Sequence, residues 1–283
     1  MEEYSDGDLT IRLYPNEQLG KTDAVMEQLQ QGTVQLYAEG STYMDKWVPS
    51  IGWVSAAFIF DDREHWARFV DSDLVKGWYA EAAEKGKVGV LGEPTAILRG
   101  PYRVMVANKD IQSFDDISGL KLRMHPDKLA HAIWTNLGAD VKTLSWTDVY
   151  QSIDKGIVDA VNSPIALVES MRFQEVAPHV IRHDEYYQSI AFMMNQAAFD
   201  ALPEKDQQAL LKAHADTGTY SEELMTAAAD ESIARMKESG VSFIDIDRAP
   251  FVAAMKTFYE GMAEEGELPE GYLETVEATR SGS

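Results

Sequence analysis

Arg123 is the side chain in this sequence best placed to hold an anionic ligand. A guanidinium stays charged at physiological pH, and its planar fork binds a carboxylate through two parallel hydrogen bonds. Residues 120–124 are predicted to form a short strand that stops before Pro126, which cannot donate to a ladder. Ligands of open α/β sheets bind outside the carboxyl ends of the strands. Arg123 is therefore a candidate carboxylate ligand, although its position alone also allows an ion pair with a neighbouring Asp.

The elements that follow Arg123 predict a parallel sheet. Residues 147–155 are expected to be a helix, with Thr147 as its N-cap and Gly156 at its end. Residues 157–161 are expected to be a second short strand. A strand, a helix and a strand within about forty residues are typical of a parallel βαβ unit.

The same pattern occurs twice in the chain. Gln28–Leu36 and Ser152–Ala160 each contain a helix end, a glycine and a strand. We interpret them as one unit used once in each of two domains, although a match this short also arises by chance. The loops after the two strands, at Gly40–Tyr43 and Asn162–Pro164, would then be equivalent. Two such loops facing each other across a cleft would form a ligand site.

Several motifs in this order resemble the solute receptors of TRAP transporters, the DctP family. They are Tyr14–Gly20, Gly119–Arg123, Trp146 with Asp148–Tyr150, Gly156–Asp159, and Ala201–Gln208 before a long helix. The resemblance implies a periplasmic-binding-protein-like α/β fold, with two α/β domains around a ligand cleft and a long helix spanning both. It also implies that a small organic acid is captured by hinge closure and delivered to the permease subunits in the membrane.

The resemblance assigns roles to individual residues. It implies that Arg123 grips the ligand carboxylate, and that Arg103, twenty positions earlier, lines the pocket as in some members. A solvated or paired arginine is the alternative for Arg103. At Ser163 the family places an Asn that donates to the ligand. The full set of expected ligand-binding residues is Arg123, Arg103, Trp146, Ser163, Asn162, Ser41, Thr42, Tyr43 and Tyr186. A second possibility is an aromatic box for a small ammonium compound. That box would be built from Tyr43, Trp47, Trp146, Tyr186 and Tyr187.

The length of 283 residues favours two domains. We expect domain I to hold residues 1–98 and about 189–220, and domain II to hold 99–188 and about 221–283. Pro203–Gly240 should be one long helix, or two in line broken near Gly218. The other expected strands lie at 8–14, 33–37, 87–91, 104–107, 189–195 and 241–246. The other expected helices are one at 22–31, two within 61–85, one at 165–171 with Ser163-Pro164 as its cap, and one at 249–261. The aromatic stretch Trp47–Phe60 should pack on domain I.

The chain carries 47 acidic against 25 basic residues, a formal net charge of −22. Such a surface repels nucleic acid and anionic membrane, and it resembles the surfaces of halophilic proteins. Cysteine is absent, which excludes disulfides and thiol chemistry. We expect His183 to be a hydrogen-bonded structural residue, because no second metal ligand lies at a suitable spacing. We therefore expect no metal site and no cofactor.

A binding protein is favoured over two other classes. An enzyme is not expected, because the sequence lacks a nucleophile elbow, a zinc-protease motif and a phosphate-binding glycine loop. A sensor would need a separate signalling partner. The resemblance implies a monomeric, periplasmic receptor, yet no signal peptide follows Met1. Met1–Asp6 is similar to the tail of the family's first helix, so we expect a native start some tens of residues earlier, with a signal peptide and one more strand.

Overall fold

The computed structural model describes residues 1–15 and 17–280, and the chain divides into two compact units. Asn16 of the motif Tyr14–Gly20 and Ser281–Ser283 lie outside the described residues. The first unit comprises Met1–Val54, Ala67–Leu98 and Gln188–Glu223. The second comprises Ser55–Trp66, Arg99–Tyr187 and Leu224–Ser283. Each unit is built around its own β-sheet, as the predicted fold class requires.

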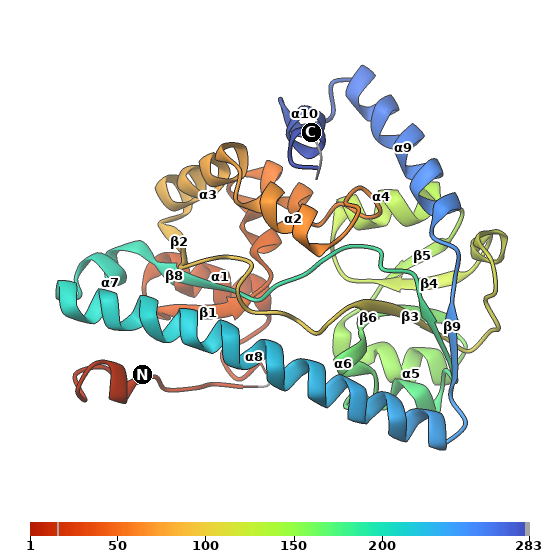
Figure 1. The fold of residues 1–283 in the computed structure, drawn as a ribbon, viewed down its shortest axis with the longest axis horizontal. Helices are drawn as coiled ribbons and strands as arrows, with labels where there is room; N and C mark the ends of the chain where they lie inside the picture. Colours follow the sequence, from red (N-terminus) through yellow and green to blue (C-terminus); the bar gives the residue numbers. More distant parts are fainter. Residues whose placement is uncertain (16, 281–283) are drawn as a thin grey trace. The chain divides into compact units, whose positions relative to one another are not determined.

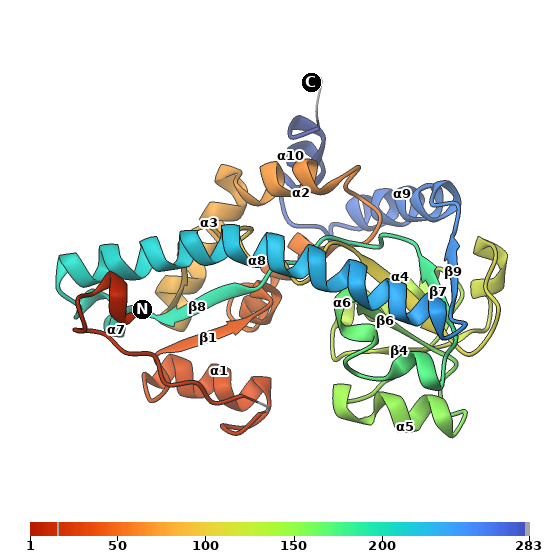
Figure 2. The same cartoon turned by 60° about the horizontal axis from the view of Figure 1, so that its bottom comes forward.

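The first unit contains a three-stranded sheet in the order β1 (Leu36–Glu39), β8 (Ala191–Asn195) and β2 (Val88–Leu91). Both pairings are antiparallel, and the central strand β8 comes from a part of the chain distant from β1 and β2. Met193 faces Tyr37 on one side and Val90 on the other. The helices of this unit include α1 (Thr22–Gln31), α3 (Asp73–Gly86) and α7 (Gln196–Asp200), and α1 runs alongside β1 (Figure 2).

The second unit contains a six-stranded sheet in the order β5-β4-β6-β3-β7-β9. The strands are β3 (Arg103–Ala107), β4 (Lys121–Met124), β5 (Asp140–Thr143), β6 (Ala160–Pro164), β7 (His179–Arg182) and β9 (Ser242–Asp245). The parallel β4–β6 pairing confirms the predicted βαβ unit. β3 is antiparallel to both of its neighbours, and the other strands share one direction. The carboxyl ends of five strands therefore lie at one edge, together with the amino end of β3 (Figure 1).

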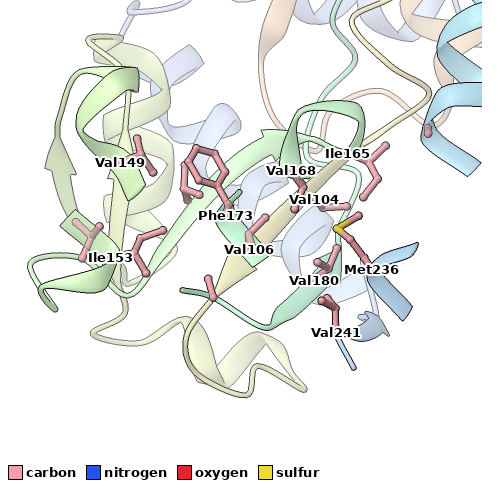
Figure 3. Packing of buried hydrophobic residues seen from close by; sticks show 14 residues of the cluster. Val104, Val106, Val149, Ile153, Ile165, Val168, Phe173, Val180, Met236 and Val241 are labelled. Atoms are coloured by element: carbon pink, nitrogen blue, oxygen red, sulfur yellow. The ribbon is translucent and has the colours of Figure 1, made fainter. Parts of the chain in front are cut away.

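A hydrophobic cluster of the second unit packs around β3 and its neighbours (Figure 3). Val104 and Val106 alternate along β3 with Arg103 and Met105, because successive side chains of a strand point to opposite faces. The helices α5 (Val149–Asp154) and α6 (Ile165–Val168) pack on the valine face. Phe173, Val180, Met236 and Val241 complete this core. Arg103, Met105 and Ala107 lie on the opposite face of β3.

The predicted pair of helix–glycine–strand units is confirmed by matching hydrogen bonds. After α1, the amides of Thr33 and Val34 both donate to the carbonyl of Gln28. After α5, the amides of Ile157 and Val158 both donate to the carbonyl of Ser152. The glycine between helix and strand has a positive φ in each case, 77° at Gly32 and 68° at position 156. The sequence analysis had placed these amides in strands, but here they bond to the end of the preceding helix. β1 therefore begins at Leu36 and not at position 33, and β6 begins at Ala160 and not at position 157.

The long C-terminal helix is continuous. α8 runs from Glu204 to Glu238 without a break at Gly218, which confirms the first of the two predicted forms (Figures 1 and 2). A Cβ at Gly218 would come within 3.0 Å of Ala96, so the glycine allows the helix to pass close to that backbone. The helix contributes its residues up to Glu223 to the first unit and those from Leu224 to the second. No helix among the described residues is long and apolar enough to cross a membrane.

Several expected elements differ in the structure. Residues 8–14 form no strand, and Leu13 is 80% exposed. Alternating apolar residues favour a strand only where a neighbour supplies hydrogen bonds, and no described strand pairs with this segment. α6 ends at Val168 rather than Met171, and Ser163 does not cap it, because β6 continues through Pro164. Thr147 is likewise not a cap, since a 3₁₀ turn precedes α5.

Other elements were not predicted. The helix α4 (Lys128–Asn136) and the strand β5 lie between β4 and α5, and β7 follows α6. The predicted helix pair within 61–85 is confirmed as α2 (Arg63–Val70) and α3, and the last helices are α9 (Ala249–Glu264) and α10 (Tyr272–Ala278). Short 3₁₀ helices lie at Glu2–Tyr4, Ser41–Lys46, Pro49–Ser55, Phe114–Ile117, Trp146–Asp148 and Phe173–Glu175. The sequence analysis placed all of 1–98 in domain I, whereas Ser55–Trp66 groups with the second unit.

Candidate functional site

The shared edge of the six-stranded sheet gathers most of the predicted ligand-binding residues. Arg123 lies one residue before the end of β4, and Arg103 is the first residue of β3. Asn162 and Ser163 lie near the end of β6. Trp146 follows β5 by three residues, and Tyr186 follows β7 by four. This is the edge at which ligands of α/β sheets bind, so the topology supports the sequence-based choice of residues.

Arg123 is held between the ends of β4 and β5. Its side chain is buried, with 5% of the residue exposed. The Nε group donates to the carbonyl oxygen of Leu144 at 2.9 Å. The guanidinium carbon lies 5.3 Å from the ring centroid of Trp146, and that ring meets Phe173 edge-on at 5.1 Å. The segment after β5 thus orients the guanidinium of Arg123 and also supplies the aromatic ring beside it.

Arg103 forms a buried ion pair with Glu185. The Nε group donates to Oε1 of Glu185 at 2.8 Å, and the two residues are 7% and 1% exposed. The guanidinium carbon also lies 4.3 Å from the ring centroid of Tyr186. Burial raises the pKa of Tyr186, so its phenol stays protonated. Arg103 therefore lies at the predicted edge as a paired arginine, one of the two alternatives for this residue, and its partner Glu185 was not singled out by the sequence analysis.

Glu185 is the centre of a hydrogen-bond network that joins two more elements. Its Oε2 accepts from the indole Nε1 of Trp134 in α4 at 2.9 Å and from Nδ2 of Asn162 in β6 at 2.6 Å. The carboxylate thus accepts three bonds within the sheet edge. Sequence reasoning missed Glu185 and Trp134. Glu185 lies 82 positions from Arg103, and no spacing rule connects them.

His183 completes this network as a neutral side chain. Nδ2 of Asn162 must face the carboxylate, since an ionised carboxylate only accepts hydrogen bonds. Oδ1 of Asn162 therefore faces His183, whose Nε2 donates to it at 3.1 Å. Burial lowers the pKa of His183 to about 4, so the imidazole carries no charge at neutral pH. The prediction of a hydrogen-bonded structural histidine is confirmed.

The remaining predicted residues have other partners in this structure. The hydroxyl of Ser163 is fully buried and donates to the carbonyl of Pro164 at 3.0 Å. Ser41, Thr42 and Tyr43 belong to the first unit, where the Ser41 hydroxyl lies 2.9 Å from the Tyr79 hydroxyl. Among residues 1–15 and 17–280, no group of three or more His, Asp or Glu is arranged to hold a metal ion.

Comparison with known proteins identifies the family. The bacterial extracellular solute-binding proteins of family 7, DctP, match residues 1–266. This chain belongs to that family. A DctP relative, the C4-dicarboxylate-binding periplasmic protein of Rhodobacter capsulatus, is 26% identical over 93% of this chain and 79% of its own length.

Solved structures of TRAP periplasmic solute-binding proteins share the fold. One from Roseobacter denitrificans with bound β-D-glucuronate has a TM-score of 0.88 and 25% identity, covering 99% of this chain and 91% of that one. One from Ochrobacterium anthropi with bound L-fuconate has a TM-score of 0.87 and 26% identity, covering 98% and 90%. This DctP protein therefore has the two-domain α/β fold that its sequence predicts and is a TRAP-type solute receptor.

Proposed function

We propose that this receptor captures a small organic acid and that Arg123 holds its carboxylate. The observation that carries the proposal is the position of Arg123, buried beside Trp146 at the edge of the sheet where five strands end. The planar fork of an arginine suits a carboxylate, and an aromatic ring beside it suits the carbon skeleton of the ligand. Arg103, Asn162, Ser163 and Tyr186 would bind or orient the rest of the ligand from the same edge. The Ser41–Tyr43 segment remains a predicted contributor from the first unit.

Relatives support an acid as the ligand. The names of the similar proteins include β-D-glucuronate, L-fuconate and C4-dicarboxylates, all of which carry a carboxylate. Several of these names place the proteins in the periplasm and in TRAP systems. We accordingly propose a periplasmic, monomeric binding protein without enzymatic activity or a cofactor. Its protein partners would be the permease subunits of a TRAP transporter.

An aromatic box for an ammonium ligand is less well supported. Such a box binds a cation through ring faces that are open to the ligand. In the second unit the guanidinium of Arg123 lies over the ring of Trp146, and that of Arg103 lies over the ring of Tyr186. A ligand cation at either ring would lie near an arginine of the same charge. Repulsion between the two cations would therefore oppose ammonium binding.

Calorimetric titration of the purified protein tests the proposed ligand class. The panel consists of L-fuconate, D-glucuronate, succinate and choline, after denaturation and refolding to remove any ligand that co-purifies. We expect saturable binding of at least one acid and none of choline. Binding of choline with no acid bound would contradict the proposal. Mass spectrometry of the denatured sample would identify the ligand carried through purification.

A further inference from the structure

The segment Ser55–Trp66, which we call the strap, is a short stretch of chain that packs into the second unit. The residues up to Val54 and from Ala67 belong to the first unit, whereas the strap groups with the second. Its buried apolar residues include Ala56, Ala57, Phe58 and Phe60. A surface connection exposes most of its side chains, so the strap is more than a connection between neighbouring segments.

Side chains near α9 hold the backbone of the strap. The hydroxyl of Tyr259 in α9 donates to the carbonyl of Ala57 at 2.8 Å, and this tyrosine is buried. Arg248, which precedes α9, donates through Nη2 to the carbonyl of Phe60 at 2.7 Å. Buried carbonyl groups need such partners. The two bonds lie on either side of Phe58 in the sequence and therefore restrict its backbone.

Phe58 has a backbone conformation that is rare for an aromatic residue. Its φ is 60°, in the left-handed region, which is costly for any residue that carries a Cβ. Its amide donates to the carbonyl of Glu185 at 2.6 Å, and its ring stacks on Phe251 in α9 with 5.0 Å between the centroids. Strained residues of this kind persist only where the surroundings hold them, and they are concentrated at functional sites. The conformation of Phe58 is thus a reason to look for a role beyond packing.

The ring of Phe58 packs on the side chains that hold the Glu185 carboxylate. Its centroid lies 6.1 Å from that of Trp134 and 6.1 Å from that of His183, and both contacts are edge-on. Trp134 donates directly to Glu185. His183 donates to Asn162, which in turn donates to the carboxylate. Phe58 therefore contacts the Glu185 network at its backbone and at two of its supporting side chains.

We propose that Phe58 is a positioning residue of the ligand site, which acts by holding Glu185 and its network in place at the sheet edge. The inference rests on the proposed function, in which an acid binds at this edge. Glu185 pairs with Arg103 and precedes Tyr186, whose ring lies under the Arg103 guanidinium at 4.3 Å. A binding site loses affinity when its supporting residues allow the groups around the ligand to shift by about 1 Å. Loss of the Phe58 ring would allow such a shift.

Phe58→Ala and Phe58→Gly distinguish positioning from packing. Both remove the ring, but glycine adopts a positive φ without strain, so Phe58→Gly should melt at the higher temperature. The probe is whichever of L-fuconate, D-glucuronate and succinate the wild type binds most tightly. At a temperature where both variants are folded, we expect calorimetry to show binding at least tenfold weaker than in the wild type, with the two affinities equal within threefold. A merely structural residue would give wild-type affinity, or affinities that follow the melting temperatures.

Phe58→Leu decides the question if the two smaller variants do not fold. Leucine keeps most of the apolar volume but loses the edge contacts of the ring with Trp134 and His183. We expect it to bind the probe at least threefold more weakly than the wild type. Wild-type affinity in every Phe58 variant that folds would overturn the inference and leave the proposed function intact. Wild type that binds none of the three acids would reject the proposed function, and the inference with it.

Phe60→Ala is the matched control. It removes the same ring from the same strap, at a residue that is equally buried and meets His65 edge-on at 5.3 Å. We expect it to lower the melting temperature and to leave the affinity for the probe within twofold of the wild type. If it weakens binding as much as Phe58→Ala does, packing of the strap as a whole is responsible, and the specific role of Phe58 is rejected.

Discussion

At the scale of single residues, burial of His183 couples the stability of this receptor to pH. The imidazole contacts Phe58 and Trp134 edge-on or tilted, and its Nδ1 has no hydrogen-bond partner among the described residues. Its pKa is about 4 in the folded protein, against about 6.5 in an unfolded chain. Between these values the unfolded state binds more protons, so stability is complete above pH ~6.5 and falls as the pH decreases towards 4.

We expect His183→Gln to reduce this pH dependence. The glutamine amide can still donate to Asn162 but cannot be protonated. The lowered pKa of His183 should reduce the free energy of unfolding by roughly 3 kcal/mol between pH 7 and pH 4. Urea denaturation at a series of pH values measures this pH dependence, and His131→Gln is the control at an exposed site. Identical pH profiles for wild type and His183→Gln would show that another group is responsible.

The residues of the candidate site differed in how far the sequence could reveal them. Arg123 was predictable because its strand, its proline stop and the family motif all lie within a few positions of it. Glu185 was not, because its role depends on donors from β3, α4 and β6 that only the folded sheet brings together. An isolated acidic residue next to tyrosines has no distinctive local pattern. Tertiary partners of this kind cannot be inferred from spacing.

At the scale of elements, two glycines of α3 should respond to alanine in opposite ways. A Cβ at Gly86 would lie 2.3 Å from the ring of Trp47, so Gly86→Ala forces the ring to move. Overpacking of this kind typically costs about 1–3 kcal/mol. Gly77 has nothing within 4 Å of its Cβ position, and alanine there should stabilise the helix by about 0.5–1 kcal/mol. Thermal unfolding of both variants tests whether Gly86→Ala destabilises the protein and Gly77→Ala stabilises it. Stabilisation by Gly86→Ala would contradict this account of the Trp47 contact.

The elements also show which local signals are reliable. Glycines at helix ends predicted where α1 and α5 stop, because a positive φ is costly for other residues. The alternating residues 8–14 led to a wrong strand prediction, because a strand depends on a neighbouring strand that lies outside the local sequence. α4 and β5 were missed because they are short and lie beside stronger motifs. The predicted domain boundaries remain a prediction, with Ser55–Trp66 grouped with the second unit.

At the scale of the whole molecule, the net charge of −22 should make the protein more stable in salt. Carboxylates on one surface repel one another, and salt screens this repulsion, with a Debye length of about 10 Å at 0.1 M and 3 Å at 1 M. We expect the melting temperature to increase steadily from 0.05 to 1 M NaCl. A melting temperature that falls over this range would show that attractive ion pairs outweigh the repulsion. Scanning calorimetry without ligand gives the answer directly.

The account depends most on Arg123 as the residue that holds the carboxylate of the ligand. In a desolvated site, removing one partner of a charged pair typically costs about 2–5 kcal/mol. Arg123→Ala should therefore weaken binding of the acid by roughly 30-fold to several thousand-fold. Arg123→Lys should restore only part of this loss, because an ammonium lacks the planar fork. Loss of the bond to Leu144 should also lower stability, so each variant needs a thermal melt before titration.

Calorimetric titration of the wild type, Arg123→Ala and Arg123→Lys with the acid that co-purifies is the most direct measurement. Arg172→Ala is the control, since that arginine is exposed and pairs with Glu175. The account predicts wild-type affinity for the control, a large loss for Arg123→Ala and an intermediate value for Arg123→Lys. Wild-type affinity in a folded Arg123→Ala protein would contradict it and would show that this arginine serves only to support the sheet edge.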